Sequence, residues 1–536
     1  MSETTGYVDE LLALYGSPQA CAAELLCDRH DPAAVAFTVI DPDLTSVDLT
    51  YGELRRRSEQ GAAALAGLGV GAGDAVATLM GKSADLVVTL LSIWRLGAVH
   101  VPLFTAFAWP AIELRLTASA AKVVVTDANQ RAKLEATDAT VVVAGGSPSV
   151  AADLALTALL DAQQTNHPAA VVGGDAPLVM IFTSGTTGTP KGVPVPVRAL
   201  ASFRAYVELG LDVTADDVFW NAADPGWAYG LYYAILGPLA AGRRSLILHA
   251  GFSPELSFAV LQTFGVTNFA AAPTVYRAMR AKPESAPAGL RLRRASSAGE
   301  PLTPEVIDWA REVLGTEVRD HYGQTEHGMV VVNAWHGDVR RPLRRGSMGH
   351  PLPGWSAAVL ADDGFEPAPA GTMGRVAIDA AASPLMWFRG YHDAPEKTAE
   401  RFSPDRRWYL TGDAGSIDAD GHYYFSSRDD DVIIMAGYRI GPFDVESVLA
   451  THPDVVESAV IGVPDQIRGE VLEAFVVLRD GVAGDDELVA ELQRWVKDKF
   501  AAHAFPRSLH FVDALPKTPS GKVQRFVLRA ERAGAR

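Results

Sequence analysis

The chain has 536 residues, of which 48% are apolar and 21% are charged, and its 47 basic and 64 acidic residues give a net charge of −17. This length exceeds what one hydrophobic core supports, so we expect two or more domains. The excess of acidic residues argues against a nucleic acid or an anionic membrane surface as the main partner.

The N-terminal region does not resemble an export or membrane-insertion signal. Its first residues are polar and acidic, unlike a signal peptide. Cys21 and Cys27 are the only cysteines and cannot make a disulfide framework. The most apolar stretch, Leu86–Phe104, contains an arginine, a histidine and a proline, which predicts a helix and a turn rather than a membrane span. We therefore expect a cytosolic protein.

Up to Arg428 the sequence alternates short β-rich runs with helical stretches, the pattern of an α/β fold. The runs predict strands at Ala75–Leu79, Lys122–Thr126, Thr140–Val143, Leu178–Phe182, Ser245–His249, Asn268–Ala271 and Arg375–Ile378. Helical spacing of apolar residues predicts helices at Gly52–Leu68, Asp85–Leu96, Pro110–Ser119, Val197–Leu209, Pro273–Ala281 and Pro304–Leu314. The segment Gly146–Val172 lacks a firm period and is expected to cross between subdomains.

The pattern changes after Arg428. Three consecutive acids, Asp429–Asp431, would repel one another in a core and indicate a surface junction. Beyond them we predict helices at Phe443–Thr451 and Asp485–Ala501, and strands at Val455–Val463, Leu472–Leu478 and Leu509–Val512. The chain is thus divided into a large α/β N-terminal domain of several subdomains, residues 1–429, and a small α+β C-terminal domain, residues 430–536.

The segment Thr183–Gly192, TSGTTGTPKG, follows an apolar strand and combines glycines, hydroxyl side chains, a proline and a lysine. Glycines let the backbone approach phosphate oxygens, N–H and O–H groups donate to them, and lysine offsets their charge. A flexible linker rarely carries a Pro-Lys pair after a buried strand. A Walker P-loop would need Ser or Thr after the lysine, where Gly192 stands. We therefore predict a triphosphate-binding loop that is not a P-loop.

A second motif joins AGEPL, Ala298–Leu302, to RDHYGQTEHG, Arg319–Gly328. The ring of Tyr322, beside a glycine, suits a stacked base, and Thr325 supplies a hydroxyl donor. Glu326 is a hard carboxylate of the kind that holds magnesium beside triphosphate oxygens. His321 and His327 flank the motif and are interpreted as ordinary loop histidines rather than groups that titrate near neutral pH.

Three further motifs lie towards the C-terminus. In WYLTGD, Trp408–Asp413, the aspartate after a Thr-Gly turn can accept both ribose hydroxyls. Arg428 and Asp430 lie at the expected domain junction. In LPKTPSGKVQR, Leu515–Arg525, two prolines and a glycine hold a turn that presents Lys522.

In this order and spacing the five motifs resemble the adenylate-forming superfamily of acyl- and aryl-CoA synthetases, luciferases and peptide-synthetase adenylation domains. The resemblance extends from Tyr51 to Arg525. Four stretches are most similar to medium-chain acyl-CoA synthetases and their acetyl-CoA synthetase relatives: Ala223–Gly242, Arg389–Phe402, Ala436–Ser447 and Pro464–Leu478. It implies ATP, Mg²⁺ and coenzyme A, and a two-step reaction. A carboxylate and ATP give an acyl-adenylate and pyrophosphate, and coenzyme A then displaces AMP.

The resemblance also implies roles for individual residues. Lys191 and the loop residues Thr183, Ser184, Gly185, Thr186, Thr187 and Gly188 would hold the leaving pyrophosphate. Thr325 would contact the α-phosphate and Glu326 the magnesium ion. Adenine would meet Asp320, Tyr322, Gly323, Gly299, Glu300 and Pro301, and the ribose would meet Asp413 and Arg428. Lys522 would bridge the carboxylate and the phosphate in the first step.

For the second step the resemblance implies rotation of the small domain. Asp430 matches the hinge, Gly437 would enter beside the coenzyme A tunnel, and Arg439, on the same loop, would contact ATP. Acetylation of Lys522 by an acetyltransferase, reversed by a deacetylase, would remove the charge that the first step needs. A homodimer is a further expectation. Ile434, where luciferases and coumarate ligases often carry lysine, argues against those branches.

The acid pocket is expected between Gly323 and the aromatic run that includes Trp227, Tyr229 and Tyr232. Acetate-specific relatives place a tryptophan where Gly323 stands, so glycine is expected to leave room for an acid larger than acetate. Rings narrow a pocket, which disfavours long fatty acids. We therefore expect a short-to-medium aliphatic or an aryl acid, and expect Gly323→Trp to shift the preference towards acetate.

Two alternatives stay open at this point. A stand-alone adenylation enzyme that loads a carrier protein would share every nucleotide motif. Amino-acid-activating members commonly carry an aspartate in the stretch that here reads WAYGLYY, and none is present. A catalytically inactive nucleotide-binding relative is the other alternative, and the intact Lys191, Glu326 and Lys522 argue against it.

Overall fold

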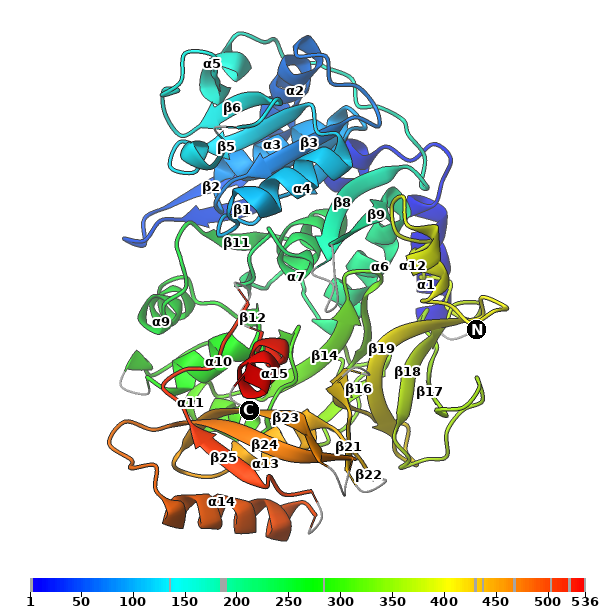
Figure 1. Cartoon of the computed structure of the whole chain (residues 1–536). Coiled ribbons are helices and arrows are strands. Elements are labelled where there is room, and N and C mark those ends of the chain that lie inside the picture. The colour runs from blue at the N-terminus through cyan, green and yellow to red at the C-terminus, as the bar shows by residue number, and fades with distance from the viewer. Residues whose placement is uncertain are drawn as a thin grey trace.

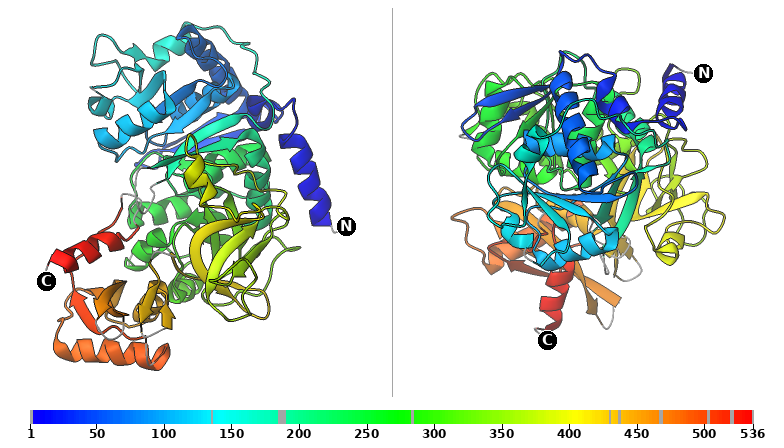
Figure 2. Two further views of the ribbon diagram at one scale, coloured as in Figure 1. Left: turned by 45° about the vertical axis from the view of Figure 1, so that its right-hand side comes forward. Right: turned by 90° about the horizontal axis from the view of Figure 1, so that it is seen from above.

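The structure is a computed structural model that describes residues 3–134, 136–183, 190–282, 285–428, 431–435, 438–465, 469–501, 504–518 and 522–534. Figure 1 shows a large body, coloured blue to yellow, above a small domain coloured orange to red. The two chain ends lie on opposite sides of the molecule (Figure 2).

Within the described residues, a seven-stranded sheet with the order β7-β6-β5-β3-β4-β8-β9 forms the upper part of the large domain. Its strands are β3 (Ala75–Leu79), β4 (Val99–Pro102), β5 (Val123–Asp127), β6 (Thr140–Ala144), β7 (Leu154–Ala155), β8 (Pro177–Thr183) and β9 (Lys191–Pro196). Apolar residues of α2 (Tyr51–Gly67) and α3 (Ala84–Arg95) pack on one face, and those of α4 (Trp109–Ser119) on the other. Because β8 and β9 form a hairpin in which Thr183 pairs with Lys191, these two residues frame the predicted phosphate loop.

A thirteen-stranded sheet of the described residues forms the middle of the molecule, in the order β17-β18-β19-β20-β16-β15-β14-β13-β12-β10-β11-β1-β2. Strands β1 (Val35–Ile40), β10 (Phe219–Asn221), β11 (Ser245–Leu248), β12 (Asn268–Ala271), β13 (Arg294–Ala298) and β14 (Val318–Gln324) run parallel. The antiparallel strands are β2 (Ser46–Thr50), β15 (Gly328–Val332), β16 (Ser347–Pro351), β17 (Ala357–Leu360), β18 (Gly374–Asp379), β19 (Trp408–Ile417) and β20 (Tyr423–Arg428).

Both faces of the parallel part are buried, as expected for parallel strands. Trp220 packs with α9 (Pro254–Thr263), α10 (Pro273–Arg280) and α11 (Pro304–Val313) on one face. Phe219, its neighbour in β10, packs on the other face with α6 (Leu200–Ala205) and α8 (Gly237–Ala241). The remaining helices of the large domain are α1 (Glu3–Tyr15), α5 (Leu156–Asp161), α7 (Ala228–Gly230) and α12 (Pro395–Ala399).

The small domain is built on a third sheet, formed by β21 (Ile433–Met435), β22 (Tyr438–Ile440), β23 (Val455–Asp465), β24 (Gly469–Leu478) and β25 (Ser508–Phe511). Its helices are α13 (Pro442–Leu449), α14 (Asp486–Lys499) and α15 (Arg525–Gly534). Val460 of β23 belongs to a core with α13 and α14, and Ile461 to a second core with Leu515 and Leu528. The small domain therefore has its own hydrophobic cores.

The predicted fold class is confirmed, and the predicted elements lie close to the observed ones: β3 and β12 have the predicted bounds. The predicted helix Val197–Leu209 is helical throughout, as a 3₁₀ turn, α6 and a π-helical turn from Tyr206 to Gly210 that follow one another without a gap. One expectation needs correction. The segment Gly146–Val172 does not cross between subdomains, because its β7 pairs with β6 and the chain returns to the same sheet through β8.

The chain passes from the thirteen-stranded sheet to the sheet of the small domain between Arg428, the last residue of β20, and Ile433, the first residue of β21. The boundary at 429/430 stays a prediction, because both residues lie outside the described part. Both cysteines are buried and free. In the part of the chain that the structure describes, no helix is long and apolar enough to cross a membrane.

Candidate active site

A tight hairpin presents Thr325 and Glu326. Gln324 at the end of β14 pairs with Gly328 at the start of β15, which leaves a loop of Thr325, Glu326 and His327. Gly328 has φ +76°, the left-handed conformation that three-residue hairpin loops favour. A Cβ there would lie 2.5 Å from the Tyr233 hydroxyl, so only glycine fits. The hairpin therefore lies at the carboxyl edge of the parallel strands, where open α/β sheets bind ligands.

The expectation that Gly323 leaves open space is wrong, because even a Cβ atom would not fit at this position. A Cβ on Gly323 would lie 2.1 Å from the backbone oxygen of Gly328 and 2.7 Å from the Cα of Met329. Glycine is needed because β14 shifts register between Tyr322 and Gly323 and approaches β15 closely. A Gly323→Trp variant would therefore displace the strands, and its acid preference would not report on pocket size alone.

The carboxylate of Asp413 joins three strands. Its Oδ2 accepts hydrogen bonds from the Tyr322 hydroxyl at 2.5 Å and from Nε2 of Gln324 at 2.6 Å. Its Oδ1 accepts one from Nη1 of Arg428 at 2.8 Å. The predicted adenine-stacking residue and both predicted ribose contacts are thus brought together, and Gln324 joins them although the sequence argument gave it no role.

A β-bulge aims Asp413 at this cluster. The register between β18 and β19 shifts around Thr411 and Gly412, and Gly412 has φ +71°. A Cβ on Gly412 would lie 2.6 Å from Nη1 of Arg401, the end of a flexible side chain, so it is the positive φ that favours glycine in this bulge. The Thr-Gly pair of the WYLTGD motif therefore forms the bulge that orients the side chain of Asp413.

Glu326 is 7% exposed and is held by a residue that sequence reasoning missed. The Tyr391 hydroxyl donates to Oε1 of Glu326 at 2.8 Å, and Nζ of Lys191 lies 4.7 Å above the Tyr391 ring. The N–H of His392 donates to the carbonyl of Gly192 at 2.8 Å, which ties this segment to β9. Burial lowers the pKa of Lys191, and the nearby Arg401 guanidinium lowers it further. Tyr391 and Arg401 both belong to the RGYHDAPEKTAERF stretch, which could have drawn attention to them.

The predicted adenine wall forms where β13 and β14 end. Gly299 has φ +98°, and Glu300 is fixed by the hydroxyl of Thr274 at 2.7 Å and by Nη2 of Arg277 at 2.8 Å. Asp320 accepts the N–H of His321 at 3.1 Å, and burial raises the pKa of Asp320 well above its ordinary value. Pro301 follows Glu300 in the loop between β13 and α11.

The two histidines beside the motif are not the ordinary loop histidines that the sequence argument expected, because both are buried and His321 lies within β14. Burial lowers the pKa of both His321 and His327 to about 3. The ring of His321 contacts the Tyr206 hydroxyl at 2.6 Å through Nδ1, and that of His327 packs 5.5 Å from the Tyr409 ring.

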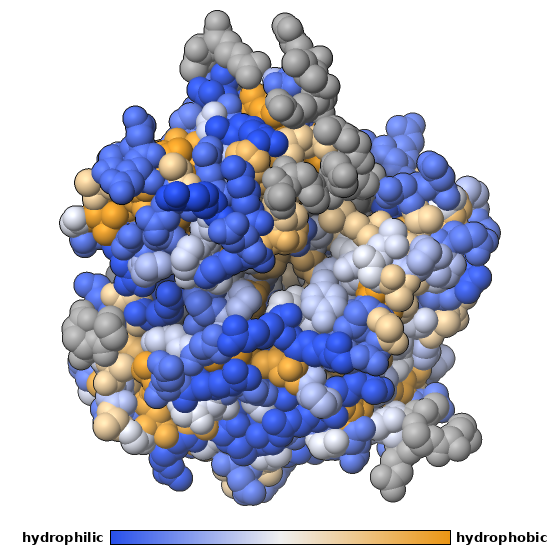
Figure 3. Space-filling view, turned by 90° about the horizontal axis from the view of Figure 1, so that it is seen from below, coloured by the Kyte–Doolittle hydropathy of each residue, from blue (hydrophilic) through white to orange (hydrophobic). Residues whose placement is uncertain are grey.

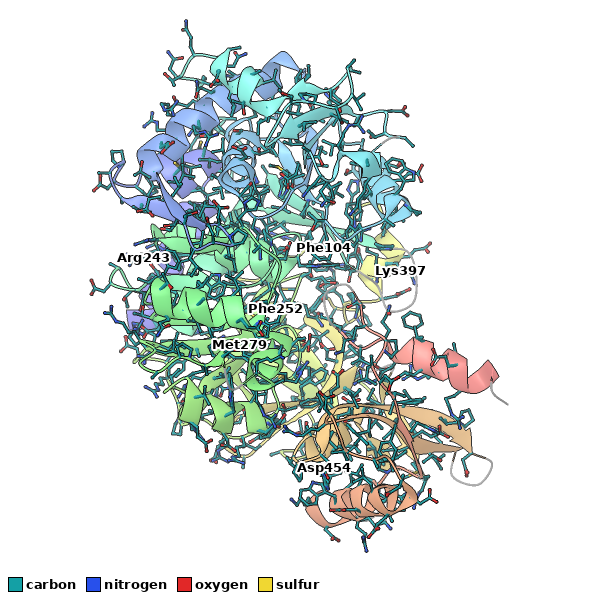
Figure 4. The ribbon with its side chains drawn as sticks, turned by 90° about the vertical axis from the view of Figure 1, so that its left-hand side faces the viewer. Phe104, Arg243, Phe252, Met279, Lys397 and Asp454 are labelled. Carbon is teal, nitrogen blue, oxygen red and sulfur yellow. The ribbon has the colours of Figure 1, made fainter. Side chains whose placement is uncertain are left out.

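The aromatic residues expected in the acid pocket serve different purposes. Tyr232 is fully buried, stacks on Phe203 at 4.3 Å, and donates its hydroxyl to the carbonyl of Thr325 at 3.0 Å. It is therefore a core residue that supports the hairpin. Trp227 is partly exposed and lies 5.3 Å from the ring of Phe104. Figure 4 shows Phe104 where the seven-stranded sheet meets the rest of the large domain. Tyr229 is partly exposed and lies 5.4 Å from the buried Tyr233.

Several predicted positions lie outside the described residues: Ser184, Gly185, Thr186, Thr187, Gly188, Asp430 and Gly437. Of Arg439 the structure describes only the backbone, which pairs with Ile434 in the β21–β22 hairpin. Lys522 is exposed in the segment between β25 and α15. In Figures 1 and 2 this red segment extends from the small domain towards the large domain. Viewed from below, the molecule is hollowed near its centre (Figure 3).

Comparison with known proteins assigns the family. The profile described as "AMP-binding enzyme" matches residues 27–392, and that described as "AMP-binding enzyme C-terminal domain" matches residues 444–522. The acetyl-coenzyme A synthetase of Bacillus subtilis is 36% identical over 490 residues, which cover 90% of this chain and 84% of that protein.

Two solved structures extend the comparison. An acyl-CoA synthetase from Brucella canis is 43% identical with a TM-score of 0.78, covering 99% of each chain. The anthranilate CoA ligase AuaEII, in complex with anthranoyl-AMP, is 28% identical with a TM-score of 0.88, covering 97% of this chain and 98% of its own. The chain therefore belongs to the AMP-binding enzyme family.

Its reaction is that of an acid–thiol ligase. ATP converts a carboxylic acid to an acyl-adenylate with release of pyrophosphate, and coenzyme A then takes the acyl group as a thioester and frees AMP. The resemblance inferred from the motifs and the enzyme class are thereby confirmed.

Gly323→Ala is expected to destabilise the protein by about 1–3 kcal/mol, because a Cβ at this position must push β14 away from β15. The urea midpoint of unfolding measures the effect, and binding of AMP should weaken with it. Gly67→Ala is the control, because a Cβ on Gly67 meets nothing within 4 Å. Equal midpoints for Gly323→Ala and Gly67→Ala would show that the strands can adapt.

Proposed function

We propose that this ligase acts on a short-to-medium-chain aliphatic acid or an aryl acid, with the residue roles given below. The observation that supports these roles is that residues of the β14–β15 hairpin contact both Asp413 and the Tyr391–Lys191 pair. Tyr322 and Gln324 on its first strand bind Asp413, while Glu326 at its tip is joined through Tyr391 to Lys191. Ribose, α-phosphate and pyrophosphate contacts thus follow one another along a single edge.

In the first step an oxygen of the carboxylate attacks the α-phosphorus, and the bond to the bridging oxygen of pyrophosphate breaks. Negative charge grows on the phosphoryl oxygens and on the leaving group, so cations and hydrogen-bond donors carry the catalysis. Lys191 and the Thr183–Gly188 loop hold the leaving pyrophosphate, Thr325 donates to the α-phosphate, and Lys522 bridges it to the acid. Tyr322 stacks on adenine against Gly299–Pro301, while Asp413 and Arg428 hold the ribose.

Glu326 fits a magnesium ion that also binds the triphosphate. Mg²⁺ is usually bound by one or two carboxylates together with substrate phosphates. In the described residues no group of three or more His, Cys, Asp or Glu could hold a metal ion, and Glu326 offers one oriented carboxylate. When bound there, the ion would neutralise charge on the phosphate oxygens.

In the second step the sulfur of coenzyme A attacks the acyl carbon, the bond to AMP breaks, and the thiol loses its proton. We propose that rotation at Asp430 removes Lys522 and brings Gly437 beside the thiol, with Arg439 on the same loop. Acetylation of Lys522, a homodimer and a cytosolic location stay predictions.

The acid class follows from the rings around Trp227. Phe104 and Phe107 lie 5.3 and 5.6 Å from Trp227, so a bound acid would meet flat apolar faces that leave little width for a long chain. The anthranilate CoA ligase named above, in complex with anthranoyl-AMP, acts on an aryl acid, which supports the aryl part of this range.

A panel of acids tests the proposal directly. Acids from acetate to dodecanoate, with benzoates, are supplied to the purified enzyme, and coenzyme A-dependent AMP formation is measured. We expect kcat/KM to be highest between the extremes of chain length or with a benzoate. Highest activity with acetate or dodecanoate would contradict the pocket, and absence of AMP with every acid would contradict the residue roles.

Lys522→Ala is expected to lose adenylation and to keep thioester formation, because the lysine is needed only while the carboxylate attacks phosphate. Pyrophosphate release measures the first step, and coenzyme A thioester formation from a supplied acyl-adenylate measures the second. Equal loss of both would rule out this role. Lys499→Ala, which changes an exposed lysine of α14 in the same domain, is the control and should change neither step.

Tyr391→Phe is expected to raise the Mg²⁺ concentration for half-maximal adenylation by about 10-fold or more, because Glu326 loses its 2.8 Å donor while the ring over Lys191 remains. Binding of Mn²⁺ with a non-hydrolysable ATP analogue, followed by electron paramagnetic resonance, should weaken in parallel. Tyr391→Leu also removes the ring and should weaken ATP binding in addition. Unchanged metal binding in Tyr391→Phe would contradict the assignment.

A further inference from the structure

The segment that carries Lys522 is a short hairpin. Lys517 forms a β-bridge with Val523, and the N–H of Gln524 donates to the carbonyl of Pro516 at 2.8 Å. Across the turn, the N–H of Lys522 donates to Oγ1 of Thr518 at 3.0 Å, and the N–H of Thr518 to the carbonyl of Lys522 at 2.7 Å. The backbone of Lys522 is therefore fixed relative to the two described arms of this hairpin, residues 516–518 and 522–524.

Each arm of the hairpin is anchored to the small domain by an ion pair. On the first arm, Nζ of Lys517 lies 2.7 Å from Oε2 of Glu457 in β23. After the second arm, Arg525 begins α15, and its Nη2 lies 2.7 Å from both carboxylate oxygens of Glu446 in α13. Oε1 of Glu446 also accepts the N–H of Val460 at 2.7 Å, so this carboxylate is itself held in place.

Arg525 also joins the hairpin to the domain junction. Its Nη1 lies 3.6 Å from Oδ2 of Asp431, the residue that follows the predicted hinge Asp430. Arg529 stands one turn further along α15, on the same face, and donates to Oδ1 of Asp431. The side chains of Asp431 and Glu446 are only 15% and 11% exposed, so these charges are poorly screened by water.

We propose that Arg525 is a positioning residue for Lys522, through which α13 and Asp431 hold the lysine hairpin in the orientation that adenylation needs. The proposal rests on the role assigned above to Lys522. Lysine has a flexible four-carbon stem, and misplacing a reacting group by about 1 Å can cost about 100-fold in rate. The three carboxylates and three cations around the hairpin fix its base, so that only the side chain of Lys522 remains to be ordered by substrate.

Arg525→Gln tests the proposal, because it removes the charge and keeps a hydrogen-bonding side chain. We expect pyrophosphate release to fall by about 10- to 100-fold in kcat, with KM for ATP and acid unchanged within about twofold. Thioester formation from supplied acyl-adenylate should stay within about threefold of wild type. Glu446→Gln removes the same contact from the acceptor side, keeps an acceptor for Val460, and serves if Arg525→Gln does not fold. Arg525→Lys should recover part of the lost rate.

Arg532→Gln is the matched control. Arg532 lies on the same helix and its Nε lies 2.7 Å from Glu473 in β24, a comparable ion pair that does not touch the hairpin. If Arg532→Gln slows the first step as strongly as Arg525→Gln, a general loosening of α15 explains the effect and the proposal is overturned. It is also overturned if Arg525→Gln slows both steps equally or neither.

A double variant separates this proposal from the role of Lys522. If Arg525 acts through the lysine, Arg525→Gln added to Lys522→Ala should cause no further loss of adenylation. A further loss would show that Arg525 acts on its own. If Lys522→Ala alone spares adenylation, the assigned role of Lys522 fails, whatever the effect of Arg525→Gln.

Discussion

The carboxylate of Asp413 is the constraint on which the nucleotide site depends. It is 3% exposed, and a buried charge is tolerated only when partners compensate for lost water. Those partners are Tyr322 and Gln324 from β14 and Arg428 from β20. Because β14 is the last parallel strand of the thirteen-stranded sheet and β19 and β20 belong to its antiparallel part, one side chain fixes how the two parts meet. Removing any one partner would take away part of the compensation for this buried charge.

A second contact brings the seven-stranded sheet to the same place. Lys191 begins β9, Tyr391 precedes α12, and Glu326 lies in the loop of the β14–β15 hairpin. The three side chains are nevertheless in contact, because Lys191 lies over the Tyr391 ring and the Tyr391 hydroxyl donates to Glu326. Lys191, near the end of the predicted phosphate-loop motif, is thereby placed beside the hairpin although the two belong to different sheets. Glycines allow these approaches: at Gly323, Gly328 and Gly412 a single added carbon would meet another atom at 2.6 Å or less. Close backbone contacts at these glycines therefore determine where the charged side chains of the site lie.

Much of this could be predicted from the sequence, and the failures share one physical origin. Strands such as β3 and β12 follow from local apolar runs, and Asp413, Glu326 and Lys191 belong to short motifs whose chemistry is readable in place. Gln324 and Tyr391 were missed because their roles come from partners 89 and 65 residues away, which no local pattern encodes. Gly323 was misread for a related reason: glycine in place of the tryptophan of acetate-specific relatives suggested open space, whereas the neighbour of Gly323 in space is the backbone of β15.

The proposed site is divided between two domains, so the interface between the large and the small domain must allow them to move relative to each other. The proposed adenine, ribose and magnesium contacts belong to the large domain, while Lys522 belongs to a small domain with its own cores. The proposed rotation is feasible only if the two bodies hold each other weakly. Near the junction the rings of Phe425 and Phe443 lie 6.0 Å apart, and Ser426 donates to Asp444. Rotation would have to release such contacts, whereas the ion pairs around the lysine hairpin lie within the small domain and would move with it. The orientation of Lys522 relative to the small domain is therefore set by those ion pairs.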